Sequence, residues 1–120
     1  MNAEELKLRT KQFAVAVARL TQALPENRIN NAYCNQIIRS SSSTGANYRA
    51  CRRAKSIADH INKLKIVEEE LDESLYFLEL LSEFNPAFKG KMDVIYSEGE
   101  ILLRIIVATL VTLRNKLNNK

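Results

Sequence analysis

A group of basic side chains occupies the middle of the sequence. Arg49, Arg52 and Arg53 are three and four residues apart, so in a helix they share one side. Several cations near a helix end can neutralise phosphates without reading the base sequence. Two plainer interpretations stay open, an ordinary basic surface and ion pairs with the acids of another subunit. The residues that we expect to bind a nucleic-acid backbone are Arg49, Arg52, Arg53, Lys55, Lys63 and Lys65.

Charge is distributed unevenly around this group. Residues 28–65 include eight basic residues and one acid, whereas residues 66–83 include seven acids and no basic residue. A solvated helix face explains most of these acids better than metal binding or acid–base chemistry does. Glu70 and Glu73 are exceptions because they fall near an apolar stripe. We expect them to make polar contacts with Asn47 or with a neighbouring subunit, because buried polar groups need partners.

Residue types that carry out catalysis or bind metals are few. Dimetal bundles use a glutamate three residues before a histidine, and the single histidine, His60, has none there. Ser41 and Ser43 have no base placed beside them for nucleophilic catalysis. The segment TGAN at 44–47 lacks the spacing of a phosphate-binding loop. We therefore expect no catalytic residue, no metal, no cofactor and no enzymatic activity.

Length and composition predict a single helical domain over residues 1–120. Three glycines and two prolines in the whole chain argue against an architecture of strands and turns. The formal charge of +4 is compatible with a polyanion partner but does not require one.

The two cysteines and the apolar segments bear on the location of the protein. On one helix, Cys34 and Cys51 would be about 25 Å apart, too far for a disulfide, so both are expected to be reduced thiols of a cytoplasmic protein. The first residues lack the pattern of a secretory signal. The apolar segment 101–113 is too short to span a membrane and contains Arg104.

The elements that position the basic and acidic residues are indicated by four stripes of apolar side chains, each with the period of an α-helix. Asn2 followed by Glu5 resembles a capping box, and Pro25 ends the first stripe. Asn85 and Pro86 end the third stripe and are expected to open the fourth helix, with Asn85 as its N-cap. Long helices joined by short loops predict an all-α, antiparallel up-down four-helix bundle. The expected helices cover about residues 3–24, 26–53, 57–84 and 88–117.

The segment RSSSSTGANYRACRRAK, residues 39–55, has the composition of a linker. Its periodicity favours a helix instead, because the stripe does not change its period when its side chains become small and polar. An unbroken helix also matches the length of its three partners. Small residues would then allow a neighbouring backbone to approach closely. The expected stripe is Ile29, Tyr33, Ile37, Ser40, Thr44, Asn47 and Cys51, with Ser40, Thr44, Asn47, Glu70 and Glu73 as structural polar residues.

Two of the predicted helices are more apolar than a monomeric bundle requires. The helix at 57–84 has a second stripe, and the helix at 88–117 is apolar nearly all round between residues 101 and 113. A helix in a four-helix monomer needs only one buried face. The surplus predicts a homo-oligomer. The second stripe is Ile66, Phe77, Leu80 and Phe84.

The residues of the two central helices resemble those of a known bacterial family. The matching stretches are Ile38-Arg39-Ser40, Gly45-Ala46-Asn47-Tyr48-Arg49, and the run from His60 to Leu81 that contains KLKIVEEELDESLYFLELL. They are similar to four-helix-bundle proteins named for intervening sequences in 23S ribosomal RNA genes, which are also called ribosomal-protein-like. The resemblance extends over nearly the whole chain and is specific in these two helices.

This resemblance implies an antiparallel four-helix bundle that assembles as a ring-shaped homopentamer, without catalytic residues. Distant relatives are accessory proteins of diversity-generating retroelements, which use a basic pentameric surface to bind nucleic acid and a reverse transcriptase. Two positions depart from the family pattern. Thr44 replaces a common apolar residue, and Ala50 replaces a common glutamate, which makes the neighbouring arginine surface more positive.

These arguments predict a non-enzymatic, oligomeric bundle that binds the backbone of RNA or DNA. The alternative is an oligomeric scaffold that binds a protein partner and has no role with nucleic acid.

Overall fold

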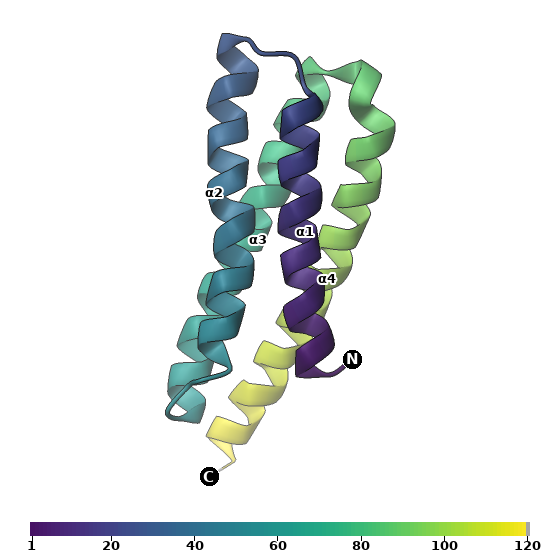
Figure 1. Ribbon diagram of the computed structural model, residues 1–120. Coiled ribbons are helices and arrows are strands. Elements are labelled where there is room, and N and C mark those ends of the chain that lie inside the picture. Colours follow the sequence, from purple (N-terminus) through teal and green to yellow (C-terminus); the bar gives the residue numbers. More distant parts are fainter. Residues whose placement is uncertain (120) are drawn as a thin grey trace.

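The computed structural model describes residues 1–119, and these residues form four long helices and one short turn. Successive helices run in opposite directions, so that the chain passes up and down the bundle (Figure 1). The molecule is a rod of 52 × 21 × 20 Å. The prediction of an all-α four-helix fold is confirmed. The helices are α1 (Ala3–Ala23), α2 (Arg28–Cys51), α3 (Ile57–Phe84) and α4 (Lys89–Asn118), and the 3₁₀ turn η1 (Pro86–Phe88) joins the last two.

Side-chain caps fix where three of the helices begin. The Asn2 side chain accepts a hydrogen bond of 2.8 Å from the Glu5 backbone N–H, as the capping-box prediction requires. Asn27 caps α2 through the Asn30 N–H at 2.8 Å, and Ser56 caps α3 through the Asp59 N–H at 3.0 Å. These bonds satisfy backbone donors that no residue within the helix can reach.

The second helix is shorter than predicted by two residues at each end. Asn27 takes extended backbone angles as the cap, so α2 begins at Arg28 and not at residue 26. At the other end Arg53 N–H donates to Ala50 O at 3.0 Å, and the chain leaves the helix in a turn. Arg52 and Arg53 therefore stand at the end of α2, beyond its last regular residue, Cys51.

The prediction that Asn85 caps α4 is wrong. Its side chain makes no capping bond, and it forms a reciprocal pair of amide hydrogen bonds with Asn30, at 2.9 and 2.8 Å. Asn30 also donates to Pro25 O, and Asn85 donates to Leu81 O. Both asparagines are buried, so their polar atoms need these partners. The pair ties the start of α2 to the connection between α3 and α4.

The core consists of the predicted apolar stripes, which face one another inside the bundle. The first predicted stripe, which α1 and its C-cap residue contribute, is entirely buried and consists of Leu6, Phe13, Val17, Leu20 and Leu24. In α4 the absence of a side chain at Gly99 makes room for its neighbours, because a Cβ there would lie 2.6 Å from Leu75 Cδ2 and 3.0 Å from the Phe13 ring. A half-buried ion pair of two hydrogen bonds, at 2.9 and 2.6 Å, joins Arg9 of α1 to Glu98 of α4.

The small-residue part of the segment, residues 39–51, lies inside one unbroken helix, as the periodicity predicted. The Ser40 and Ser74 hydroxyl oxygens are 2.8 Å apart and join α2 to α3. The Thr44 hydroxyl donates to Ser40 O at 2.9 Å, which satisfies this buried polar group. On the side facing α1, a Cβ at Gly45 would be 3.6 Å from the Thr10 carbonyl carbon and oxygen. Small side chains therefore bring α2 close to both neighbours.

Two members of the predicted α2 stripe, Ile29 and Asn47, are not buried as expected. Asn47 is only half-buried, and Tyr48 takes the buried position beside it. Ile29 is 40% exposed, and Asn30 is buried in its place. The contact predicted between Asn47 and the acids of α3 does not form. Asn47 donates to Ser43 O and Oγ, both at 2.8 Å.

Arg39 is the partner of the two acids instead. Its guanidinium forms ion pairs with Glu70, at 3.1 Å, and with Glu73. The two carboxylates lie on one edge of α3, where an arginine of α2 can reach both. Glu70 and Glu73 thus have a polar partner within the same chain, one that the sequence did not reveal.

Part of the surplus apolar surface stays exposed on the single chain. Ile66 and Phe84 of the second α3 stripe are exposed, whereas Phe77 and Leu80 are half-buried. On α4 the outward-facing side chains of Ile101, Val107 and Val111 are also exposed. None of the described helices combines the length and the apolar character that crossing a membrane requires.

Candidate nucleic-acid interface

The three predicted arginines meet at the end of α2, beside the start of α1. All three side chains are exposed, and they line a hollow of about 500 Å³ together with Glu4 and Lys7 of α1. The chain turns at Arg52 and Arg53, and this turn lets both side chains lie beside that of Arg49. The predicted grouping of Arg49, Arg52 and Arg53 is therefore present in the structure.

A second hollow, of about 370 Å³, continues the first one along the bundle. Lys7, Lys11 and Arg49 line it, over a floor of small residues that includes Ala14 and Gly45. Lys7 and Arg49 line both hollows, so the two are adjacent. We call this continuous surface the basic groove, and define it by Lys7, Lys11, Arg49, Arg52 and Arg53.

The lysines of α1 were not predicted from the sequence. Lys7 and Lys11 are four residues apart and therefore share a side of the helix. Their spacing was visible, but it did not show that this side of α1 faces the arginines of α2. The close approach of the two backbones at Gly45 and Thr10 places these lysines opposite Arg49.

Ion pairing separates the predicted basic residues into two sets. Within residues 1–119, the side chains of Arg49, Arg52, Arg53 and Lys55 form no ion pair with an acid. Lys63 is paired with Asp59 at 2.9 Å, and Lys65 with Glu68 at 2.7 Å. Neither of these lysines lines the basic groove, so the structure does not bring them together with the three arginines.

Lys55 lies in the turn between α2 and α3 and lines a third hollow, of about 270 Å³, with Arg52 and His60. Beside it, the Lys55 backbone N–H donates to the Asp59 carboxylate at 3.0 Å. This bond and the Lys63 ammonium lower the pKa of Asp59 below its ordinary value, so that the carboxylate stays charged. Asp59 thereby caps the turn and holds Lys63 away from the basic groove.

The acidic and cysteine side chains bear on metal binding and on nucleophilic chemistry. Across the described residues, no group of three or more His, Cys, Asp or Glu side chains is arranged to hold a metal ion. Both cysteines are free thiols. Burial raises the pKa of the Cys51 thiol to about 11, so it is uncharged and a poor nucleophile near neutral pH.

The fold and the basic groove together define a small helical bundle with a cationic surface suited to a polyanion. The chain belongs to the family of 23S rRNA-intervening sequence proteins, whose sequence model matches residues 5–108. It is also similar to the crystal structure of a protein of unknown function from the S23 ribosomal protein family of Bacteroides thetaiotaomicron. The two are 30% identical, with a TM-score of 0.83, over 92% of this chain and 98% of that one. A comparison with curated proteins found no match.

Proposed function

We propose that this protein binds the sugar–phosphate backbone of RNA or DNA through the basic groove, without catalysing a reaction. The supporting observation is that cations from two helices line one connected surface, and that its three arginines have no acid partner in the described chain. Cations that are not already paired are free to replace the counterions of phosphates, which is the main source of sequence-independent affinity.

The lining of the groove favours a double-stranded or structured nucleic acid. Proteins that bind single strands generally stack the bases on exposed aromatic rings. No aromatic side chain lines either hollow of the groove. The exposed rings of Tyr76 and Phe84 belong to α3, which contributes no lining residue to the groove. Binding would therefore rest on phosphate contacts, and a duplex offers them at higher density. The family name, which refers to ribosomal RNA, is consistent with this class of partner.

The proposed functional form is a homo-oligomer, a ring-shaped homopentamer as the family resemblance implies. It is supported by the exposed apolar residues of α3 and α4, which another subunit would bury. Such a ring would display one basic groove per subunit and so multiply the number of phosphate contacts.

The second candidate function is a scaffold for a protein partner. The observation that favours it is the outer surface of α3, where exposed Tyr76 and Phe84 accompany the acids Glu69, Asp72 and Glu83. A basic partner with an apolar face would match that surface.

The two candidates differ in their response to salt and to the loss of the arginines. We would measure the fluorescence anisotropy of labelled RNA duplex, DNA duplex and single-stranded DNA over a salt series. The test variant is R49A/R52A/R53A. Each arginine that contacts a phosphate contributes about 0.9 to the slope of log affinity against log salt, so the variant is expected to bind more weakly and with a shallower slope.

The matched control is R28A/R104A/R114A, which removes the same charge from exposed positions elsewhere on α2 and α4. It is expected to bind almost as tightly as the wild type. If the wild type binds no nucleic acid even at low salt, the proposal is rejected and the scaffold function is left. An equal loss in both variants would show that net charge, and not the groove, governs binding.

A further inference from the structure

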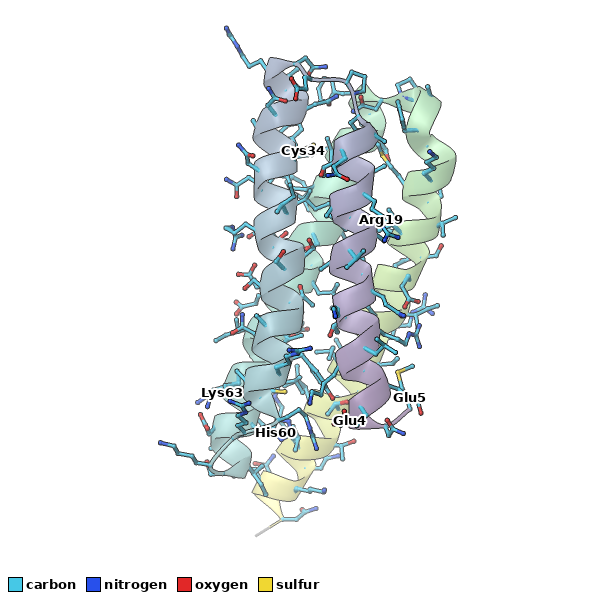
Figure 2. All side chains as sticks on the ribbon, in the orientation of Figure 1. Glu4, Glu5, Arg19, Cys34, His60 and Lys63 are labelled. Carbon is cyan, nitrogen blue, oxygen red and sulfur yellow. The ribbon has the colours of Figure 1, made fainter. Side chains whose placement is uncertain are left out.

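The basic groove continues past its last arginine to the single histidine of the chain. His60 is half-buried in the first turns of α3 and lines the hollow of about 270 Å³ with Arg52 and Lys55. Arg52 also lines the groove, so this hollow adjoins it. Figure 2 shows His60 at the end of the bundle where the start of α1, marked by Glu4, also lies. The three hollows therefore form a connected series from Lys11 to His60.

Cations face His60 from more than one element. Arg52 approaches from the end of α2, Lys116 from α4, and Lys55 from the turn between α2 and α3. Asp59, the neighbouring acid, is already bound by Lys63 and by the Lys55 N–H. Burial, with Arg52 and Lys116, lowers the pKa of His60 below its ordinary value, and Asp59 opposes this effect. Near neutral pH the free protein therefore has an uncharged imidazole here.

We propose that His60 is the terminal residue of the phosphate-binding surface, and that its protonation is coupled to the binding of a nucleic-acid backbone. This inference rests on the proposed function. A phosphate placed between Arg52, Lys55 and His60 compensates the cations that disfavour the imidazolium, and it accepts a hydrogen bond from the protonated ring. Binding therefore adds a proton to His60, and a lower pH strengthens binding.

The size of the coupling follows from thermodynamic reciprocity. If bound nucleic acid raises the pKa of His60, then protonation raises the affinity by the same factor. A rise of one pKa unit corresponds to about a tenfold gain in affinity between the pH at which His60 is neutral and the pH at which it is charged. Other groups near the site do not imitate this effect. Phosphodiesters stay ionised over this range, and the Cys51 thiol, with a pKa of about 11, stays protonated.

The test follows the C2–H proton resonance of His60, which is unambiguous because the chain has one histidine. We would titrate the full chain by NMR from pH 5 to 8, alone and with a saturating RNA duplex. The expected result is a rise in the pKa of His60 by about one unit on binding. The R52Q substitution should raise the pKa of His60 in the free protein. It should also reduce the further rise in this pKa that the duplex causes. A purely structural histidine would not show this second effect.

Affinity measurements provide the second readout. From pH 7.5 to pH 5.5 the wild type is expected to gain several-fold in affinity for the duplex, with about tenfold as the limit for a rise of one pKa unit. H60Q keeps a hydrogen-bond donor but cannot gain a charge, so it is expected to lose most of this gain. Circular dichroism would establish whether H60Q is folded. If H60Q is not folded, the wild-type NMR titration alone tests whether protonation of His60 is coupled to binding. A His60 pKa unchanged by bound duplex overturns the inference and leaves the proposed function intact. If no duplex binds at any pH, both fail.

Discussion

Glu4 is the acidic side chain in the lining of the basic groove. It lies in the first turn of α1, where its carboxylate, 84% exposed, is 3.5 Å from the Lys7 ammonium. A carboxylate in this position repels phosphates and engages one of the groove lysines. Removing its charge should therefore improve binding without altering the shape of the groove.

We expect Glu4→Gln to raise the affinity for duplex RNA at low salt by a factor of about two to five, the range that exposed charge pairs support. Fluorescence anisotropy at several salt concentrations would measure it. Glu26→Gln is the matched control, because Glu26 is an exposed acid in the connection between α1 and α2, at the opposite end of the bundle (Figure 1). Equal gains in the two variants would contradict a local role for Glu4.

At the scale of single residues, the sequence predicted part of the site. The three arginines of α2 could be grouped because one helix fixes their spacing. The pairing of Lys63 with Asp59 was also readable, since the two are four residues apart in a helix. The contribution of α1 was not readable, because spacing within one helix does not show which partner each side of it faces. His60 joined the site only through the turn that brings Arg52 beside it.

At the scale of helices, two glycines make opposite contributions to stability. Both lie in helix interiors, where alanine is about 1 kcal/mol more favourable than glycine. At Gly45 a Cβ would make ordinary contacts of 3.6 Å with the backbone of α1. At Gly99 it would lie 2.6 Å from a Leu75 methyl group and 3.0 Å from the Phe13 ring, both buried.

We therefore expect Gly45→Ala to stabilise the protein by up to about 1 kcal/mol. Gly99→Ala is expected to destabilise it by about 1 kcal/mol, because the penalty of overpacking, about 1–3 kcal/mol, exceeds the gain in helix propensity. Urea unfolding followed by circular dichroism measures both. The Leu75→Ala background should reduce the penalty at Gly99, because it removes the closer of the two contacts. If both substitutions stabilise the wild-type chain equally, the packing around Gly99 is looser than described.

The helices themselves could largely be predicted from the sequence, for physical reasons that differ along the chain. In α2 the inward-facing positions keep the same spacing where the side chains become serines. This is so because a helix buries the same side along its length, whatever the size of the side chains there. The roles of Asn30 and Asn85 could not be predicted, since their amide pair forms only when two distant connections meet. Asn85 before a proline resembled an N-cap, and the tertiary contact prevailed over this local preference.

At the scale of the whole molecule, the exposed apolar residues are the basis of the proposed oligomer. We expect light scattering at micromolar concentration to give a multiple of the 13.7 kDa chain, and about 68 kDa for the proposed pentamer. Burial of apolar surface between subunits is the driving force, at about 25 cal/mol for each Å². A monomer under these conditions would contradict the argument from surplus apolar surface.

The variant V107E/V111E tests which surface associates. Both side chains are exposed on α4, so charged replacements should leave the fold intact and dissociate the oligomer. Val94→Glu serves as a control, because Val94 is the most exposed of the large apolar side chains, at 72%, and lies near the start of α4. Dissociation by Val94→Glu alone would assign the contact to that end of the helix.

The small side chains between α1 and α2 also determine how far apart the two walls of the site lie. The lysine wall and the arginine wall of the basic groove are connected covalently only at the far end of the rod, through the loop before Arg28 (Figure 1). Near the groove they are joined by packing alone, over a floor of small residues that includes Ala14 and Gly45. The width of the groove is therefore set by the size of these residues and not by the loop.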